Sequence, residues 1–339
     1  MKYLVLFSIL CNFTTNVLAQ EEEHADIRPS VAEGAIVTDG FIDPISETIP
    51  GLRVFGYDFG EDPEAPYFAS DPGINAAAGS GLPGGSQLAL EIPSSASFDL
   101  AANLTYWDGD DADTNTPGVQ VNFGTVPGGE EFTLSLSGAG SVTVGNTTAS
   151  QNGFNIQQVL ASGAVHRHLS SVLDAPGTPA DGIYLLPMRL TSSDLSIAPS
   201  QALFLVFNNG LLEAQHDDAI DYVTLNYAYT LGDMDGDGDR DNFDIEPFEL
   251  ALTNSAAYLA EYPELTSYRR RGDIDGDGDF DNFDIQPFEQ LLTGSGPGGV
   301  AVPEPASFGL MLLGLLTSLV VRARGSSGRS ASPRILPAD

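Results

Sequence analysis

The chain has few bases, one cysteine and one tryptophan. Its 339 residues include 13 Lys and Arg against 47 Asp and Glu, a formal net charge of -34, and Lys2 is the only lysine. A chain this acidic repels phosphate backbones, which excludes nucleic acid as a partner and favours divalent cations. Cys11 lies in a segment that we expect to be removed, so the mature protein should have no disulfide or thiolate chemistry.

The motifs of several large enzyme classes are also missing. The sequence contains no G-x-S-x-G elbow, no H-E-x-x-H pair, no P-loop and no G-x-G-x-x-G turn between a strand and a helix. It therefore offers little support for catalysis.

Residues 1–19 have the three parts of a secretory signal peptide. Lys2 supplies the positive charge, the stretch from Tyr3 to Cys11 is apolar, and Val17-Leu18-Ala19 fits the small-residue rule for cleavage. We expect cleavage after Ala19 and an exported protein. The alternative is a buried N-terminal strand.

The other end of the chain carries a short apolar run between a proline-rich triplet and two arginines. Pro303-Glu304-Pro305 precedes an uncharged stretch of 16 residues, 306–321, and Arg322 and Arg324 follow it. A helix of this length spans ~24 Å, less than the ~30 Å hydrocarbon core, so it suits transient insertion better than a permanent anchor. The arginines after the helix would leave the body of the protein outside the cytoplasm.

Residues 302–324 resemble the PEP-CTERM sorting signal, whose parts are this triplet, a short hydrophobic helix and a basic cluster. The resemblance implies cleavage by an exosortase, with the C-terminal segment initially in the inner membrane and the product at the cell envelope, the cell surface or in the extracellular matrix. We expect a basic, flexible tail at 325–339, which family members usually lack, and a Gly-rich linker at 295–301. An ordinary C-terminal anchor is the alternative.

One internal repeat occurs at an offset of 40 residues. Residues 232–252 (GDMDGDGDRDNFDIEPFELAL) and 272–292 (GDIDGDGDFDNFDIQPFEQLL) are identical at 16 of 21 positions. Each copy begins like a twelve-residue calcium loop, in which alternate carboxylates point inward at a hard divalent ion and a glycine makes the sharp turn. The predicted ligands, at loop positions 1, 3, 5, 7, 9 and 12, are Asp233, Asp235, Asp237, Asp239, Asp241 and Asp244 in the first loop and Asp273, Asp275, Asp277, Asp279, Asp281 and Asp284 in the second.

The repeat therefore predicts two calcium ions. The seventh residue of each loop would contribute its backbone carbonyl, and the ninth would act directly or through a water. Without an ion the acids of each loop repel one another, so we expect folding of this segment to depend on calcium. The alternative is a flexible surface loop of Asp and Gly.

Residues 231–294 resemble a dockerin module, a tandem of calcium loops and helices with Asp in place of Glu at the twelfth loop position. The resemblance implies a cohesin-like partner that contacts loop positions 10 and 11, which are Asn242-Phe243 and Asn282-Phe283 here. Family members often carry Ser or Thr there, and Arg240 stands where an apolar residue is usual. Packing between the helices of the module is the alternative role of both phenylalanines.

From residue 20 to residue 230 the pattern is typical of strands. Short runs alternate apolar and polar residues, as at 132–136, 184–190 and 223–229, and clusters of Gly, Pro, Asn and Asp separate them. No amphipathic helix longer than three turns is evident. The pattern predicts a mostly β ectodomain, an antiparallel β-sandwich or jelly roll, followed by the small helical calcium module.

Two histidines of this region share a strand face. His166 and His168 flank Arg167 in an extended stretch, so both imidazoles should point to one side, where His216 could complete a metal site. Exposed or hydrogen-bonded strand histidines are the alternative. Trp107, which precedes a run of acids, could stack on a sugar; a packed tryptophan beside a solvated turn is the plainer explanation.

Two functional hypotheses follow. The first is a non-catalytic, exported calcium-binding protein that displays a β-sandwich for binding a polysaccharide or a matrix protein. The second is a polysaccharide-active hydrolase, or a metal-dependent enzyme using His166 and His168, that carries a dockerin-like module. Calcium as the only stoichiometric metal would favour the first, whereas a bound transition metal or glycan turnover would favour the second.

Overall fold

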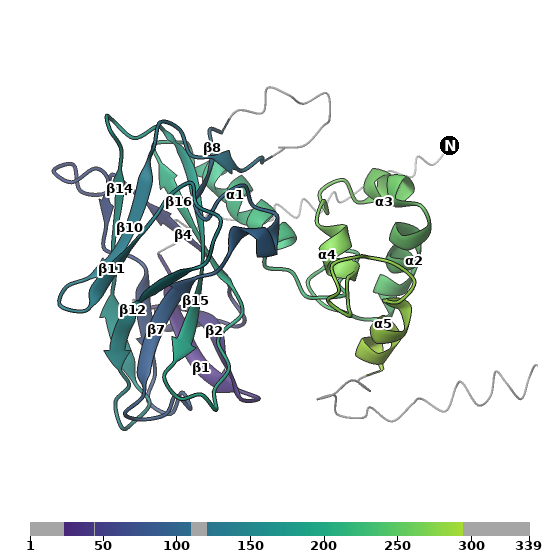
Figure 1. The fold of residues 1–339 in the computed structure, drawn as a ribbon, viewed down its shortest axis with the longest axis horizontal. Coiled ribbons are helices and arrows are strands. Elements are labelled where there is room, and N and C mark those ends of the chain that lie inside the picture. The colour runs from purple at the N-terminus through teal and green to yellow at the C-terminus, as the bar shows by residue number, and fades with distance from the viewer. Residues whose placement is uncertain (1–23, 44, 110–120, 294–339) are drawn as a thin grey trace, which may run out of the picture. The chain divides into compact units, whose positions relative to one another are not determined.

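The computed structural model describes residues 24–43, 45–109 and 121–293 (Figure 1). Four predicted segments lie outside the described residues: the signal peptide (1–19), the Gly-rich linker (295–301), the sorting signal with its hydrophobic helix (302–324) and the tail (325–339). Within the described ranges, no helix is both long and apolar enough to cross a membrane.

The chain divides into two compact units. The larger unit holds the described residues up to Thr230 together with Gly236–Gly238 and Ala256–Ser267. The smaller unit holds Leu231–Asp235, Asp239–Ser255 and the described residues from Tyr268 onward.

The larger unit is mostly β with open, largely antiparallel sheets, which confirms the predicted class. One sheet has the order β13-β6-β1-β2-β3, a second β11-β10-β14-β5, and a third β12-β7-β15-β16-β4 with β8 and β9 beside β15. The pairs β1–β6 and β4–β16 are parallel. The strands are β1 (Asp26–Ala32), β2 (Ala35–Ile42), β3 (Glu47–Ile49), β4 (Val54–Asp58), β5 (Phe68–Ala69), β6 (Gly73–Ala76), β7 (Gln87–Ile92), β8 (Thr105–Trp107), β9 (Gly124–Thr125), β10 (Glu131–Leu136), β11 (Gly140–Val144), β12 (Gln151–Gln158), β13 (Val165–His168), β14 (Ser170–Asp174), β15 (Gly182–Ser192) and β16 (Leu203–Asn209).

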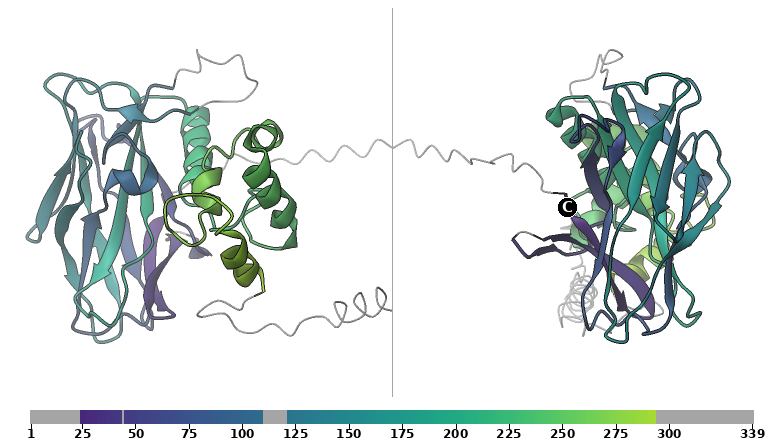
Figure 2. Two further views of the ribbon diagram at one scale, coloured as in Figure 1. Left: turned by 45° about the vertical axis from the view of Figure 1, so that its right-hand side comes forward. Right: turned by 90° about the vertical axis from the view of Figure 1, so that its left-hand side faces the viewer.

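Strands β15 and β16 are buried on both faces, which explains their nearly unbroken apolar sequences. Tyr184 and Leu205 point into a core shared with the other sheets. Leu185 and Val206 point the opposite way, into a second core that helix α1 (Glu213–Asn226) completes with residues such as Val223. The left view of Figure 2 shows α1 lying along the sheet. The central sheet is therefore a middle layer.

The alternation at 223–229 predicts a strand, and this prediction is wrong because the segment belongs largely to α1 and its C-terminal end. The buried residues of α1 are His216, Ala219, Val223 and Asn226, which follow one another at intervals of three or four. Two of these four are polar, so the helical period is hidden in a pattern of apolar residues alone.

The remaining helices belong to the repeat region. They are α2 (Ile245–Thr253), α3 (Ser255–Glu261), α4 (Tyr268–Gly272) and α5 (Ile285–Leu292), and 3₁₀ turns occur at Ser95–Phe98 and Asn242–Asp244. Helices α2 and α5 pack through Phe248 and Phe288, whose rings stack with centroids 4.1 Å apart, and Phe280 meets Phe248 edge-on. The aromatic cluster gives the smaller unit its core.

Candidate functional site

Each acidic loop is closed by the carboxylate at its twelfth position. In the first loop, Asp244 is 1% exposed and accepts backbone N–H groups from Met234 at 2.5 Å, from Asp235 at 3.2 Å and from Asp241 at 2.8 Å. Gly238, at the predicted sharp turn, has a φ of 99°, a left-handed conformation that favours glycine. The sequence predicts Asp244 as a metal ligand; the structure adds that it ties the start of the loop to its end.

The second loop repeats this arrangement. Asp284 accepts backbone N–H groups from Ile274 at 2.7 Å, from Asp275 at 3.2 Å and from Asp281 at 2.9 Å. Asp273 accepts further N–H groups from Gly276 and Gly278, which curl the loop around its first carboxylate. The same closure in both copies indicates that the repeat encodes one loop geometry.

Carboxylates gather in both loops at spacings that suit a hard cation. Ligand oxygens of Asp233, Asp235 and Asp244 lie within 4.8 Å of one another, and so do those of Asp273, Asp275 and Asp277. Burial raises the pKa of Asp244 and of Asp273, which makes their charged forms costly unless a cation accompanies them. Each cluster could therefore hold a hard divalent cation through oxygen ligands.

The other predicted ligands lie in the same loops with different contacts. The carboxylates of Asp241 and Asp281 accept the N–H groups of Phe243 and Phe283, at 2.6 and 2.7 Å, and so cap the turn that follows each loop. In the second loop, Asp279 donates its N–H to the Asp277 carboxylate at 2.9 Å. The remaining predicted ligands of the first loop are Asp237 and Asp239.

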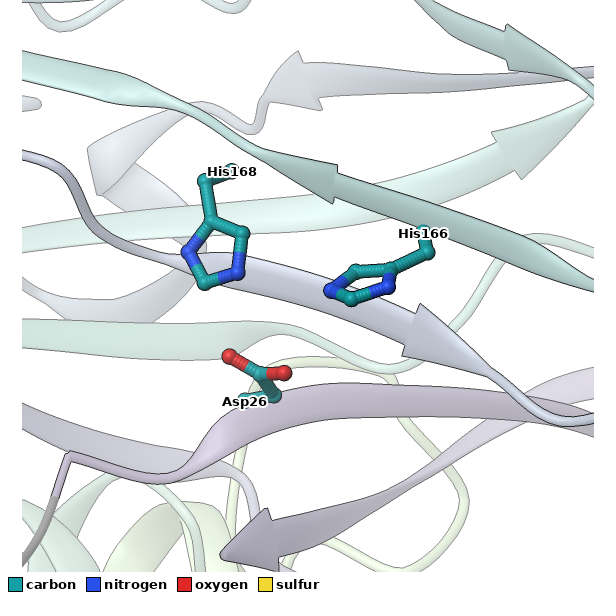
Figure 3. A group of neighbouring side chains, drawn as sticks. All are labelled: Asp26, His166 and His168. Carbon is teal, nitrogen blue, oxygen red and sulfur yellow. The ribbon is translucent and has the colours of Figure 1, made fainter. Parts of the chain in front are cut away.

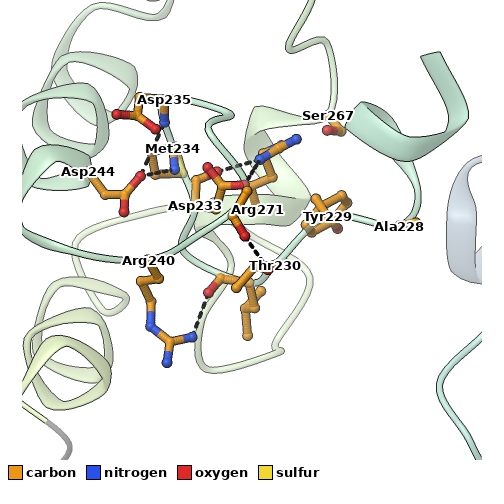
Figure 4. A network of polar contacts seen from close by, with 12 residues as sticks. Ala228, Tyr229, Thr230, Asp233, Met234, Asp235, Arg240, Asp244, Ser267 and Arg271 are labelled. Carbon is orange, nitrogen blue, oxygen red and sulfur yellow. Dashed lines mark hydrogen bonds and ion pairs between the residues drawn. The ribbon is translucent and has the colours of Figure 1, made fainter. Parts of the chain in front are cut away.

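Electrostatics distinguishes the two loops. The guanidinium of Arg271 lies 3.1 Å from the carboxylate of Asp233 and donates to its carbonyl oxygen at 2.5 Å, with both side chains at most 3% exposed (Figure 4). Leu231, which occupies the matching place in the first copy, carries no charge. A protein cation thus already accompanies the first ligand of the first loop.

Phe243 and Phe283 do not pack between the helices, because each is 75% exposed. Ile245 and Ile285, two residues further on, are also exposed, at 40% and 39%. The eighth residues of the two loops, Arg240 and Phe280, differ in their contacts. Phe280 joins the aromatic core, whereas Arg240 donates to the carbonyl of Leu231 at 2.9 Å. Both copies of the repeat therefore present the same pair of apolar side chains to solvent.

The larger unit brings His166 and His168 together, but with Asp26 and not with His216. The three side chains converge on adjacent parts of one sheet (Figure 3), and their nearest ligand atoms lie within 4.8 Å of one another. Asp26 comes from β1, which is separated from β13 by β6. Nothing local in the sequence links residue 26 to residues 166–168, so only the sheet order reveals this partner.

His216 lies elsewhere, on α1. Its Nε2 is 3.0 Å from the carbonyl of Val206, and its buried Nδ1 has no hydrogen-bond partner among the described residues. Nδ1 is 3.9 Å from a carboxylate oxygen of Asp58 and 4.0 Å from one of Glu213. These three residues form another potential ligand cluster that the sequence pattern does not predict.

Asp58 also faces His24, which completes the chain's set of four histidines. His24 lies between two carboxylates, with Nε2 3.6 Å from Asp58 and Nδ1 3.5 Å from Asp71. The pKa of His24 is raised to about 10, chiefly by its interaction with the Asp58 carboxylate and to a lesser extent by that with Asp71. Burial would raise the pKa of Asp58, but its interactions with His24 and His216 outweigh this and lower it. At neutral pH this raised pKa favours a charged His24 between the carboxylates of Asp58 and Asp71.

Trp107 packs inside the protein. It belongs to β8, is 3% exposed and joins the core beneath α1. It therefore does not offer a sugar-stacking surface, and most of the acidic run that follows it lies outside the described residues.

No family model, no curated protein and no solved structure matches the chain.

Proposed function

We propose that the protein is an exported, non-catalytic calcium-binding protein of the cell surface or extracellular matrix. The observation that carries the proposal is the pair of acidic loops, which share one ligand pattern and one closure by Asp244 and Asp284. Each loop would hold one calcium ion, through the clustered carboxylates and the backbone carbonyl of the seventh loop residue. Calcium would neutralise the loops and fix the orientation of the helices that follow them.

The exposed phenylalanines support a docking role for the repeat region, which we propose to be a dockerin-like module. Asn242-Phe243 and Asn282-Phe283 repeat the same chemistry, and both rings are open to solvent. A cohesin-like or other matrix partner with an apolar pocket could engage either copy, since exposed aromatic side chains supply large contact areas at low entropic cost. The mostly β unit, which we propose to be a sandwich or jelly roll, would be displayed to bind a polysaccharide or another protein.

The two ends of the sequence support export. The signal-like residues 1–19 and the sorting-signal resemblance at 302–324 fit a chain that crosses the inner membrane and is processed by an exosortase-type enzyme. The strong excess of acids also suits a protein that works where divalent cations are abundant.

Calcium titration of the full chain by isothermal calorimetry tests this proposal. We expect two calcium ions per chain, with Asp235→Asn removing one and Asp275→Asn removing the other. Asp194→Asn is the matched control, because that carboxylate lies outside the acidic loops and accepts hydrogen bonds from nearby Ser196. Absence of calcium binding, or two ions retained in both loop variants, would contradict the proposal.

A further inference from the structure

We propose that Asp26, His166 and His168 form a site for a divalent transition ion on the exposed face of the first sheet, with zinc as the probe that reveals it. This site is separate from the acidic loops and goes beyond the proposed function. A transition ion bound here would favour the metal-dependent enzyme of the second hypothesis, whereas the calcium loops of the proposed function do not depend on it. Its donor set is two imidazoles and one carboxylate, which suits zinc, iron, cobalt or nickel, whereas calcium takes oxygen ligands.

The three side chains are already gathered as a metal would require. One ligand atom from each lies within 4.8 Å of the other two. The imidazoles of His166 and His168 stand side by side on β13, with ring centroids 5.5 Å apart, and the Asp26 carboxylate faces them (Figure 3). Both histidines are exposed, so an ion and its water ligands can enter from solvent.

Gly73 explains how a carboxylate from β1 reaches histidines two strands away. It lies on the intervening strand β6, opposite His168 in the β-ladder. A Cβ at this position would lie 1.7 Å from Oδ1 of Asp26 and 3.1 Å from Cε1 of His168. Because Gly73 has no side chain, the Asp26 carboxylate and the His168 imidazole can approach each other across β6.

Asn75 fixes the orientation of the carboxylate. Its amide donates to Oδ2 of Asp26 at 3.1 Å, which leaves Oδ1 on the side of Gly73 and His168. Asp26 is only 7% exposed, and the described residues give it no ion pair. Buried carboxylates are normally paired with a cation or bound to a metal. Asp26 therefore suits the role of a metal ligand, and the hydrogen bond from Asn75 holds it in place as such bonds commonly hold metal ligands.

The other histidine-containing cluster, formed by Asp58, Glu213 and His216, is the weaker metal site. Its carboxylate from Asp58 is already paired with His24, whose raised pKa makes it a resident cation. The group around Asp26 has two imidazoles and no such competitor among the described residues.

Zinc titration of the full chain, with calcium in excess to fill the acidic loops, tests the proposal. We expect one zinc per chain, and we expect Asp26→Asn or His168→Gln to weaken zinc binding by about 100-fold or more. Asn75→Ala should weaken it by roughly 10-fold, and Gly73→Ala should weaken it because the added methyl group displaces Asp26. Arg167→Gln is the matched control on the same strand and should bind zinc as the native chain does.

Cobalt gives an independent readout, because its visible spectrum reports imidazole ligation and should change in His166→Gln and His168→Gln. The exposed histidine variants keep the test valid even if Asp26→Asn unfolds, since neither histidine contributes to the core. The proposal is overturned if no zinc binds. It is equally overturned if zinc binding persists in both histidine variants, or is lost only in His216→Gln, which would place the ion at α1.

Discussion

At the scale of single residues, His24 shows how a histidine can hold one charge state across neutral pH. It lies between the carboxylates of Asp58 and Asp71, and their attraction raises its pKa from 6.5 to about 10. Its imidazolium links the residues just before β1 to the end of β4 and to the loop before β6. The ion pair therefore holds the first described residues against strands from elsewhere in the sequence.

The sign of the resulting pH dependence is fixed by the raised pKa. The stabilisation is fully present below the unfolded value of 6.5 and is lost as pH rises through about 10. We expect His24→Gln to lower the free energy of unfolding by roughly 1–3 kcal/mol at pH 6, after allowance for solvent screening, and by progressively less toward pH 10. Urea unfolding of both chains at several pH values measures the difference. For the control Arg167→Gln, the difference in free energy of unfolding from the native chain should not shrink as pH rises. A difference between His24→Gln and the native chain that grows with pH would contradict the raised pKa of His24.

At the scale of elements, the two acidic loops are alike in backbone closure and unlike in charge. Helix α4 places Arg271 against Asp233, so the first loop already contains one positive charge beside its carboxylates. Calcium affinity depends on the number of uncompensated ligand charges. We therefore expect the second loop to fill before the first.

Removing the guanidinium should strengthen calcium binding at the first loop. With the second loop silenced by Asp275→Asn, Arg271→Met should tighten calcium binding at the first loop by roughly tenfold, because Asp233 then faces the ion alone. Arg269→Met removes the same charge from an exposed place on the same helix and should change the affinity far less. Equal effects of the two variants in calorimetry would mean that only net charge matters, contrary to this interpretation.

At the scale of the whole molecule, the two units depend on different forces. The larger unit has two apolar cores on either side of β15 and β16, and it needs no ion to bury them. The smaller unit has the aromatic cluster of Phe248, Phe280 and Phe288, but its loops concentrate carboxylates whose repulsion opposes folding.

Chelation should therefore unfold one unit and spare the other. We expect EGTA to remove the circular dichroism signal of α2, α4 and α5 while leaving the fluorescence of Trp107 unchanged. Trp107 is the chain's only tryptophan and is buried in the larger unit, which makes it a selective reporter. A helix signal that survives EGTA, or a red shift of Trp107 emission, would show that the units do not respond in this way.

The parts of the structure that local pattern determines could be predicted from the sequence. Alternating residues such as Phe132 and Leu134 are buried in a strand, and Gly238 makes the sharp turn of an acidic loop. The sequence does not reveal contacts set by strand order, such as Asp26 with His168, or a helix whose inner face includes the polar His216. It also does not show that Phe243 is exposed, because an apolar ring fits a core and a binding surface equally well.

The position of β13 affects how copies of this chain behave when they are crowded. It ends the order of the first sheet, so within the described part of the chain no strand of that sheet lies beyond it. Such an edge can recruit a strand from another molecule and begin aggregation. The sequence His166-Arg167-His168 places polar, exposed side chains along this edge, and the Arg167 charge discourages a second copy from pairing there. The same short strand that offers imidazoles to a metal thus also helps to keep densely packed copies from joining edge to edge.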